Sequence, residues 1–244
     1  MTKIGGRTGE LMTMVHELST RTGVDWDGWP IPPTAAPLLA ANSWEQEQLP
    51  TVAAVIPTIP PRRFSLLSHA LASVWKQTYP ISQVSIAVDT ARHGAAVTRY
   101  RALLAVNNNI DWVAFLDDDD EWYPNHVAAL LACAIRTDAD YVFSHYDLNR
   151  TPNVFATPEE PEGHWGKPFN NDHPHHTTMT VLVKTGLAKH VGFSKRPEGD
   201  EAGGEDWRFT LGCVEAGAKI VHLPEMTWFW RHHQLNTSGR EDRW

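Results

Sequence analysis

Apolar runs alternate with helical patterns between residues 51 and 120, and this alternation constrains the fold more than any other feature of the chain. The β-branched run at residues 51–56 ends at Pro57, which predicts a buried strand with a loop at its carboxyl end. The next segment has apolar residues at helical spacing: Phe64, Leu67, Leu71 and Trp75. Further along we expect strands at 84–88 and 112–116, separated by a helix at 99–106. This order predicts a parallel sheet with helices on its faces.

The second half of the chain continues the pattern less regularly. It contains, in order, a helix at 125–135, strands at 141–144 and 178–183, a helix at 206–216, and strands at 219–222 and 227–230. We therefore expect one α/β domain over residues 51–244. Residues 1–50 join an amphipathic pattern at 9–23 to a stretch rich in Pro and Trp, so we expect a helix and an extended segment that pack on the domain.

Composition disfavours several classes of protein. The formal net charge of -8 argues against a general electrostatic attraction to nucleic acid. The first residues lack the apolar core of a signal peptide, and no stretch approaches the roughly 20 apolar residues of a membrane span. Cys133 and Cys213 lie in apolar stretches, which indicates buried reduced thiols rather than a disulfide framework. We expect a soluble, cytoplasmic protein.

Polar residues follow three of the predicted strands. Thr58, Asp89 and the run Asp117 to Asp120 all stand where a strand leaves the sheet, so we expect them to meet in one crevice at the carboxyl edge. Four consecutive carboxylates repel one another, and a divalent ion that prefers oxygen ligands, Mg²⁺ or Mn²⁺, is the natural compensation. The alternative is a solvated acidic turn that caps the helix starting near Pro124.

Two later polar clusters are further candidates. Two glycines precede Glu205 and Asp206 at the start of a predicted helix, where a carboxylate can serve as a general base or simply as a first-turn helix acid. Arg231 and His233 follow the last predicted strand, where they suit phosphate and metal contacts or form a surface basic turn.

Three histidines, His173, His175 and His176, lie in a loop rich in Pro and His. They suggest zinc, but no cysteine is near and the spacing fits no zinc template. Contacts with a second substrate, or an ordinary loop, are the other interpretations of this cluster.

Six short motifs of the chain resemble those of a known family. AAVIPT, VDT, TRYRAL, FLDDDDEWYP, GGEDWRF and WFWRHH resemble, in this order, the motifs of inverting family 2 glycosyltransferases with the GT-A fold. The resemblance covers roughly residues 51–238. It implies a Rossmann-like, mostly parallel sheet with helices on both faces and a smaller sheet on the acceptor side. The donor half would be 51–145 and the acceptor half 146–244.

The resemblance also implies a role for each matching residue. The nucleotide and its sugar would be bound by Pro57, Thr58, Asp89, Arg99, Asp117 and Asp118. Asp117 and Asp119 fall on the two acids of the DxD pattern, with Asp119 and His233 as metal ligands and Asp206 as the catalytic base. Further candidate contacts are Glu205, Trp207 and Arg231. The chain departs from the family at Ile59 and Pro60, where an aromatic residue and Asn are common.

The expected activity is metal-assisted transfer of a sugar, hexosyl or related, from a nucleotide-diphosphate sugar to an acceptor hydroxyl with inversion. A UDP-sugar is favoured as donor, and Mn²⁺ or Mg²⁺ is the expected cofactor. The alternatives are a nucleotidyltransferase of similar fold and a non-catalytic module that binds nucleotide or carbohydrate. The acceptor stays open among glycan, lipid carrier, protein and modified nucleic-acid base, and so does the oligomeric state.

Overall fold

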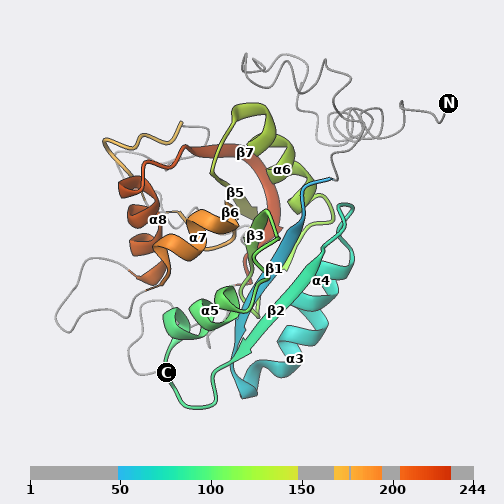
Figure 1. The fold of residues 1–244 in the computed structure, drawn as a ribbon. Helices are drawn as coiled ribbons and strands as arrows, with labels where there is room; N and C mark the ends of the chain where they lie inside the picture. The colour runs from blue at the N-terminus through green and yellow to red at the C-terminus, as the bar shows by residue number, and fades with distance from the viewer. Residues whose placement is uncertain (1–48, 148–167, 176, 194–203, 232–244) are drawn as a thin grey trace, which may run out of the picture.

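A computed structural model describes residues 49–147, 168–175, 177–193 and 204–231 of the chain (Figure 1). The predicted helix at 9–23 and nearly all of the Pro- and Trp-rich stretch lie outside these residues, as do His176 and His233.

The strands form one seven-stranded sheet in the order β2-β1-β3-β6-β5-β7-β4 (Figure 1). They are β1 (Val52–Thr58), β2 (Gln83–Val88), β3 (Trp112–Phe115), β4 (Glu121–Trp122), β5 (Tyr141–Asp147), β6 (Val181–Lys184) and β7 (Ile220–Phe229). β1 pairs in parallel with β2 and β3, as the strand–helix alternation predicts. The α/β fold class is therefore confirmed.

The other half of the sheet is mixed rather than mostly parallel. β6 is antiparallel to both β3 and β5, and β4 is antiparallel to β7. Because β6 reverses direction between its neighbours, β5 and β7 again run in the direction of β3. Among the described strands, the smaller acceptor-side sheet is not separate, since β4 joins the same sheet through β7.

The two strands expected at 219–222 and 227–230 are one strand, β7. Its pairing with β5 shifts where Ser144 lies opposite Leu223 and His145 opposite Met226. Pro224 falls inside this shift, and a bulge is one of the few places where a sheet accepts a residue without an N–H donor. Proline therefore bends the strand here without ending it.

Helices cover both faces of the sheet (Figure 1). They are the continuous run η3 (Pro60–Arg62), α3 (Arg63–Ser65), η4 (Leu66–Ala70) and α4 (Leu71–Trp75), then α5 (Ala95–Leu104), α6 (His126–Thr137), α7 (Thr185–Val191) and α8 (Glu205–Glu215). The short helix α7 was not expected from the sequence.

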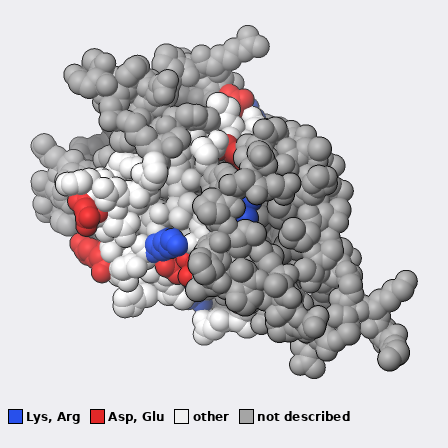
Figure 2. Space-filling view, turned by 90° about the horizontal axis from the view of Figure 1, so that it is seen from above, with Lys and Arg blue, Asp and Glu red and all other residues white. Residues whose placement is uncertain are grey.

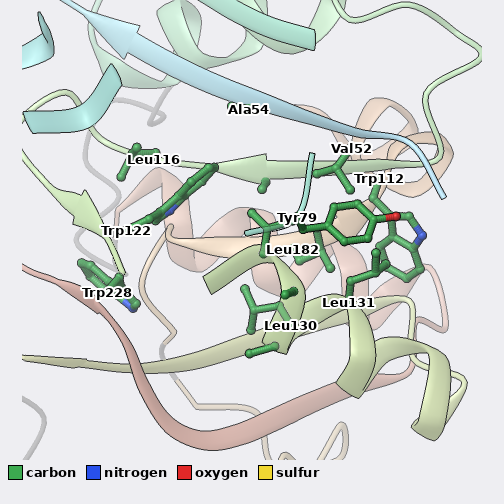
Figure 3. Close-up of a cluster of buried hydrophobic side chains, with 14 of the residues drawn as sticks. Val52, Ala54, Tyr79, Trp112, Leu116, Trp122, Leu130, Leu131, Leu182 and Trp228 are labelled. Atoms are coloured by element: carbon green, nitrogen blue, oxygen red, sulfur yellow. The ribbon is translucent and has the colours of Figure 1, made fainter. Parts of the chain in front are cut away.

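Alternate residues of β1 belong to two different cores. Val52, Ala54 and Ile56 pack with α4 and α6, and Figure 3 shows side chains of this cluster from the strands and from α6. Ala53 and Val55 pack with α5, α7 and α8 on the other face. A strand buried on both faces reads as a continuous apolar run, which is why this segment was recognisable. Cys133 and Cys213 are buried free thiols, as expected.

The apolar stripe expected between residues 64 and 75 is right at Leu71, which is 7% exposed, but wrong at its other three positions. Phe64 is 76% exposed and Trp75 71% exposed, whereas Leu66 and Val74 are buried against the sheet. Residues 66–70 form a π-helical turn, which adds a residue to the turn and rotates the buried face. Simple helical spacing does not account for such a turn.

Candidate active site

The three strand ends meet as predicted. Thr58 ends β1, Asp89 directly follows β2, and the acidic run follows β3 at the same edge of the sheet. The Thr58 hydroxyl donates a hydrogen bond of 2.6 Å to Asp118. The backbone N–H of Asp89 donates to the carbonyl of Thr58 at 2.8 Å. These contacts place the nucleotide-side candidates in one region.

The centre of the acidic run is buried and contacts an arginine. Asp118 and Asp119 are 3% and 5% exposed. Arg62 Nη1 lies 3.1 Å from Asp118 Oδ1 and 2.9 Å from Asp119 Oδ2. Burial raises the pKa of each of the two carboxyl groups to about 6, although Arg62 opposes the change. Negative charge is therefore costly here, and the site favours cations.

Arg99 connects the acidic run to helix α8. Its guanidinium donates to Asp117 at 2.6 Å and to Glu205 at 2.8 Å, and it lies over the ring of Phe193. Arg99 is 3% exposed, and although burial acts against the charge of Glu205, Arg99 lowers the pKa of that carboxyl group. Two carboxylates far apart in sequence are thus held together by one buried cation.

Asp206, the predicted base, is the second residue of α8 and so lies beside this link. Its Oδ1 accepts a hydrogen bond of 2.7 Å from the N–H of Trp207. Burial and the neighbouring charge of Glu205 raise the pKa of Asp206, which makes its carboxylate more basic. A Cβ at Gly204 would lie 2.8 Å from Asp206 Oδ1, so a larger residue there would displace the Asp206 carboxylate.

The carboxylate of Asp89 organises the loop that follows β2. It accepts hydrogen bonds from the N–H groups of Ala91, His93 and Gly94 at 3.2, 3.0 and 2.8 Å. Although burial acts in the other direction, these donors lower the pKa of Asp89. The predicted contact with the nucleotide base stays a prediction.

The end of β7 also reaches the acidic run. The N–H of Arg231 donates to Asp120 at 2.9 Å, and its guanidinium contacts Glu121. His69 Nδ1 lies 2.9 Å from the same Glu121 carboxylate. Sequence reasoning singled out Arg231 but gave His69 and Glu121 no role, because only folding brings η4 and β7 together.

A second polar and aromatic cluster lies along β5 and β7. The rings of Phe143 and His222 stack at 4.6 Å, and His145 meets His222 edge-on at 4.4 Å. His175 contacts the edge of Phe143, whereas His173 is exposed. Within the described ranges, no group of three or more His, Cys, Asp or Glu residues is arranged to hold a metal ion. The described histidines therefore give the zinc interpretation no support.

The same observation limits how the acidic run would hold Mg²⁺ or Mn²⁺. Among the described residues, fewer than three such side chains converge as ligands. Hard divalent ions of this kind often take one or two carboxylates and complete their shell with water and phosphate oxygens. Asp118 and Asp119, which are buried and acidic, fit that arrangement with a diphosphate as the remaining ligand.

Comparison with known proteins now decides the family. The model of "Glycosyl transferase family 2" matches residues 64–189, which is more than half of the chain. The chain belongs to glycosyl transferase family 2. The expected family is thereby confirmed, and VDT, TRYRAL and FLDDDDEWYP lie within the matched residues, whereas the other three motifs lie outside them. No curated protein matches this family 2 chain.

Solved structures show the same GT-A fold. S. aureus TarS 1–349 in complex with UDP-GlcNAc gives a TM-score of 0.61 at 14% identity, over 78% of this chain and 61% of that one. TarS 1–349 alone gives 0.57 at 17%, over 73% and 60%. Mannosyltransferase PcManGT from Pyrobaculum calidifontis, in complex with GDP-Man and Mn²⁺, gives 0.56 at 15%, over 95% and 68%.

The family 2 chain thus spans about 60% of the length of the TarS 1–349 chains. In the part of the chain that the structure describes, no helix has the length and apolar character needed to cross a membrane.

Proposed function

We propose that this family 2 chain transfers a sugar from a nucleotide-diphosphate sugar to an acceptor hydroxyl, with inversion at the anomeric carbon. The observation that carries the proposal is the bridge from Asp117 through Arg99 to Glu205, which brings the base candidate Asp206 to the acidic run. TarS in complex with UDP-GlcNAc and PcManGT in complex with GDP-Man support a nucleotide-sugar donor. We favour a UDP-sugar.

Each side chain of the site has a task in this reaction. Pro57, Thr58 and Asp89 would contact the nucleotide. Arg99 and Asp117, which are hydrogen-bonded to each other at 2.6 Å, would contact the diphosphate and sugar. The acceptor oxygen attacks the anomeric carbon, the bond to the diphosphate oxygen breaks, and the acceptor proton moves to the Asp206 carboxylate. A raised pKa suits Asp206 for this task, since it increases the affinity of the carboxylate for the proton.

A divalent ion would supply charge compensation on the leaving diphosphate. Asp119, with Asp118 beside it, would hold the ion, and PcManGT in complex with Mn²⁺ supports this choice of metal. His233 and Trp207 stay candidates for the metal and the substrate, respectively.

The test is a panel of UDP- and GDP-sugars incubated with the full chain and Mn²⁺. We expect release of a nucleoside diphosphate from at least one donor, slowly by hydrolysis and faster with acceptor present. Release of pyrophosphate instead would identify a nucleotidyltransferase, and nucleotide binding without turnover would identify a non-catalytic module.

The Asp206→Asn variant tests the base. Because the amide cannot take the acceptor proton, we expect transfer to fall by roughly 10²–10⁴-fold, with no loss of melting temperature and with unchanged nucleotide affinity. Wild-type activity in this variant would contradict the assignment.

A further inference from the structure

Arg62 is the basic residue that touches both central acids of the run. One of its nitrogens, Nη1, lies 3.1 Å from Asp118 Oδ1 and 2.9 Å from Asp119 Oδ2. The side chains of the two acids are 4% and 6% exposed, and that of Arg62 is 18% exposed. The guanidinium of Arg62 is therefore more exposed to solvent than the two carboxylates that it contacts.

The other partners of the acidic run do not replace this charge. Thr58 contacts Asp118 through a neutral hydroxyl. Arg99 uses its two terminal nitrogens on Asp117 and Glu205. The charge of Arg231 also acts on Asp119, but it is the Arg62 guanidinium that lies within 3.1 Å of both Asp118 and Asp119, the acids proposed to hold the metal.

A guanidinium and a divalent ion compete for such a pair. Both are cations, and both need the same carboxylate oxygens, so binding of one there raises the electrostatic cost of the other. We propose that Arg62 competes with the divalent ion for Asp118 and Asp119, and that its guanidinium moves to the donor diphosphate when the ion binds. This inference rests on the proposed function, because it presumes a metal and a diphosphate at this site.

The local backbone suits an exchange made by the side chain alone. Arg62 ends the short helix η3, in which Pro60 and Pro61 restrict the backbone. A long side chain on a stiff turn reaches two positions by rotamer changes, without moving the loop. The planar fork of a guanidinium also matches phosphate oxygens in a bidentate manner.

The experiment measures binding rather than turnover. Mn²⁺ is titrated calorimetrically into the full chain, first without nucleotide, for wild type, Arg62→Gln and Arg63→Gln. Arg63 is the matched control, because it is the exposed neighbour and its loss removes the same charge. We expect Arg62→Gln to bind Mn²⁺ about tenfold more tightly than wild type, since a like charge beside the ion is removed. Arg63→Gln should bind as wild type does.

UDP and GDP are then titrated at saturating Mn²⁺. Here Arg62→Gln should bind the nucleotide about tenfold more weakly than wild type, because a phosphate contact is lost. Arg62→Lys keeps the charge and should bind Mn²⁺ within a few-fold of wild type, which separates loss of charge from a misfolded loop. Opposite changes for metal and nucleotide are not expected from a residue with a merely structural role.

If Arg62→Gln binds Mn²⁺ as tightly as wild type or more weakly, the proposed competition between Arg62 and the ion is wrong. It is also wrong if neither wild type nor Arg62→Gln binds Mn²⁺. Unchanged nucleotide affinity overturns the proposed movement to the diphosphate. Failure of the proposed function looks different: the wild type would bind Mn²⁺ and nucleotide yet release no nucleoside diphosphate from any sugar donor.

Discussion

Two arginines organise the acids of the site. Arg62 holds Asp118 and Asp119, while Arg99 holds Asp117 and Glu205. Arg99 is the more deeply buried of the two, and each of its terminal nitrogens contacts a different carboxylate. A buried ion pair costs most when one partner is lost, because the remaining charges are left without compensation.

Arg99→Lys tests this bridge. A lysine keeps the charge but offers one compact ammonium, which does not span two carboxylates as a guanidinium does. We expect the free energy of unfolding to fall by about 3 kcal/mol, measured by urea denaturation. Arg101→Lys, an exposed change on the same helix, should have little effect. Equal stability of the two variants would show that Arg99 does not bridge the two acids.

The helical run between β1 and β2 shows how an element departs from its sequence pattern. Its π-helical turn at residues 66–70 turns Leu66 and Ala70 toward the sheet and leaves Leu67 57% exposed. Ser73, also buried, accepts a hydrogen bond of 3.1 Å from the N–H of Trp122, so a polar residue occupies part of the buried face.

Adjacent leucines in this element give a matched pair of variants. Leu66→Ala removes a buried side chain and should lower the free energy of unfolding by about 2–4 kcal/mol. Leu67→Ala removes an exposed one and should change it by less than about 0.5 kcal/mol. Chemical denaturation of both proteins checks the difference. A larger loss of stability for Leu67→Ala than for Leu66→Ala would indicate that Leu67, and not Leu66, belongs to the buried face.

At the scale of the molecule, a few charged side chains are buried among the described residues, and most of them belong to the candidate site. On the face shown in Figure 2, some described acidic side chains lie beside basic ones, and others lie apart from them at the left edge. Asp120, by contrast, is 4% exposed beside three other acids, and burial and these charges raise its pKa well above the ordinary value of 3.8. The native state therefore binds this proton more tightly than the unfolded state.

This difference predicts how stability depends on pH. A raised native pKa lowers stability as pH rises above about 4, and the loss persists at neutral and alkaline pH. Asp120→Asn should therefore unfold at a higher temperature than wild type at pH 8, and the advantage should shrink toward pH 4. Thermal unfolding of wild type and Asp120→Asn between pH 4 and pH 8 tests this prediction. A gain in melting temperature that does not depend on pH would show that the raised pKa of Asp120 is not its cause.

Sequence alone determined the features that depend on local pattern. The runs that became β1 and β3 were recognisable because a strand buried on both faces needs consecutive apolar residues. β2 lies at the edge of the sheet and alternates buried and exposed residues, so its β-branched content rather than full burial made it recognisable. Since parallel strands end at one edge, Thr58, Asp89 and the acidic run were expected to meet there, and they do. The start of α8 at Glu205 was expected within one residue.

Tertiary structure decided the features that depend on distant partners. The insertion of β6 between β3 and β5, the bulge that carries β7 past Pro224, and the partners of Arg62 and Arg99 all join segments far apart in the chain. No local period encodes such pairings, because strand order and ion-pair choice are set by which surfaces meet after the chain has folded. The four acids can thus be identified from the sequence, whereas their pairing with Arg62 and Arg99 is determined only by the fold.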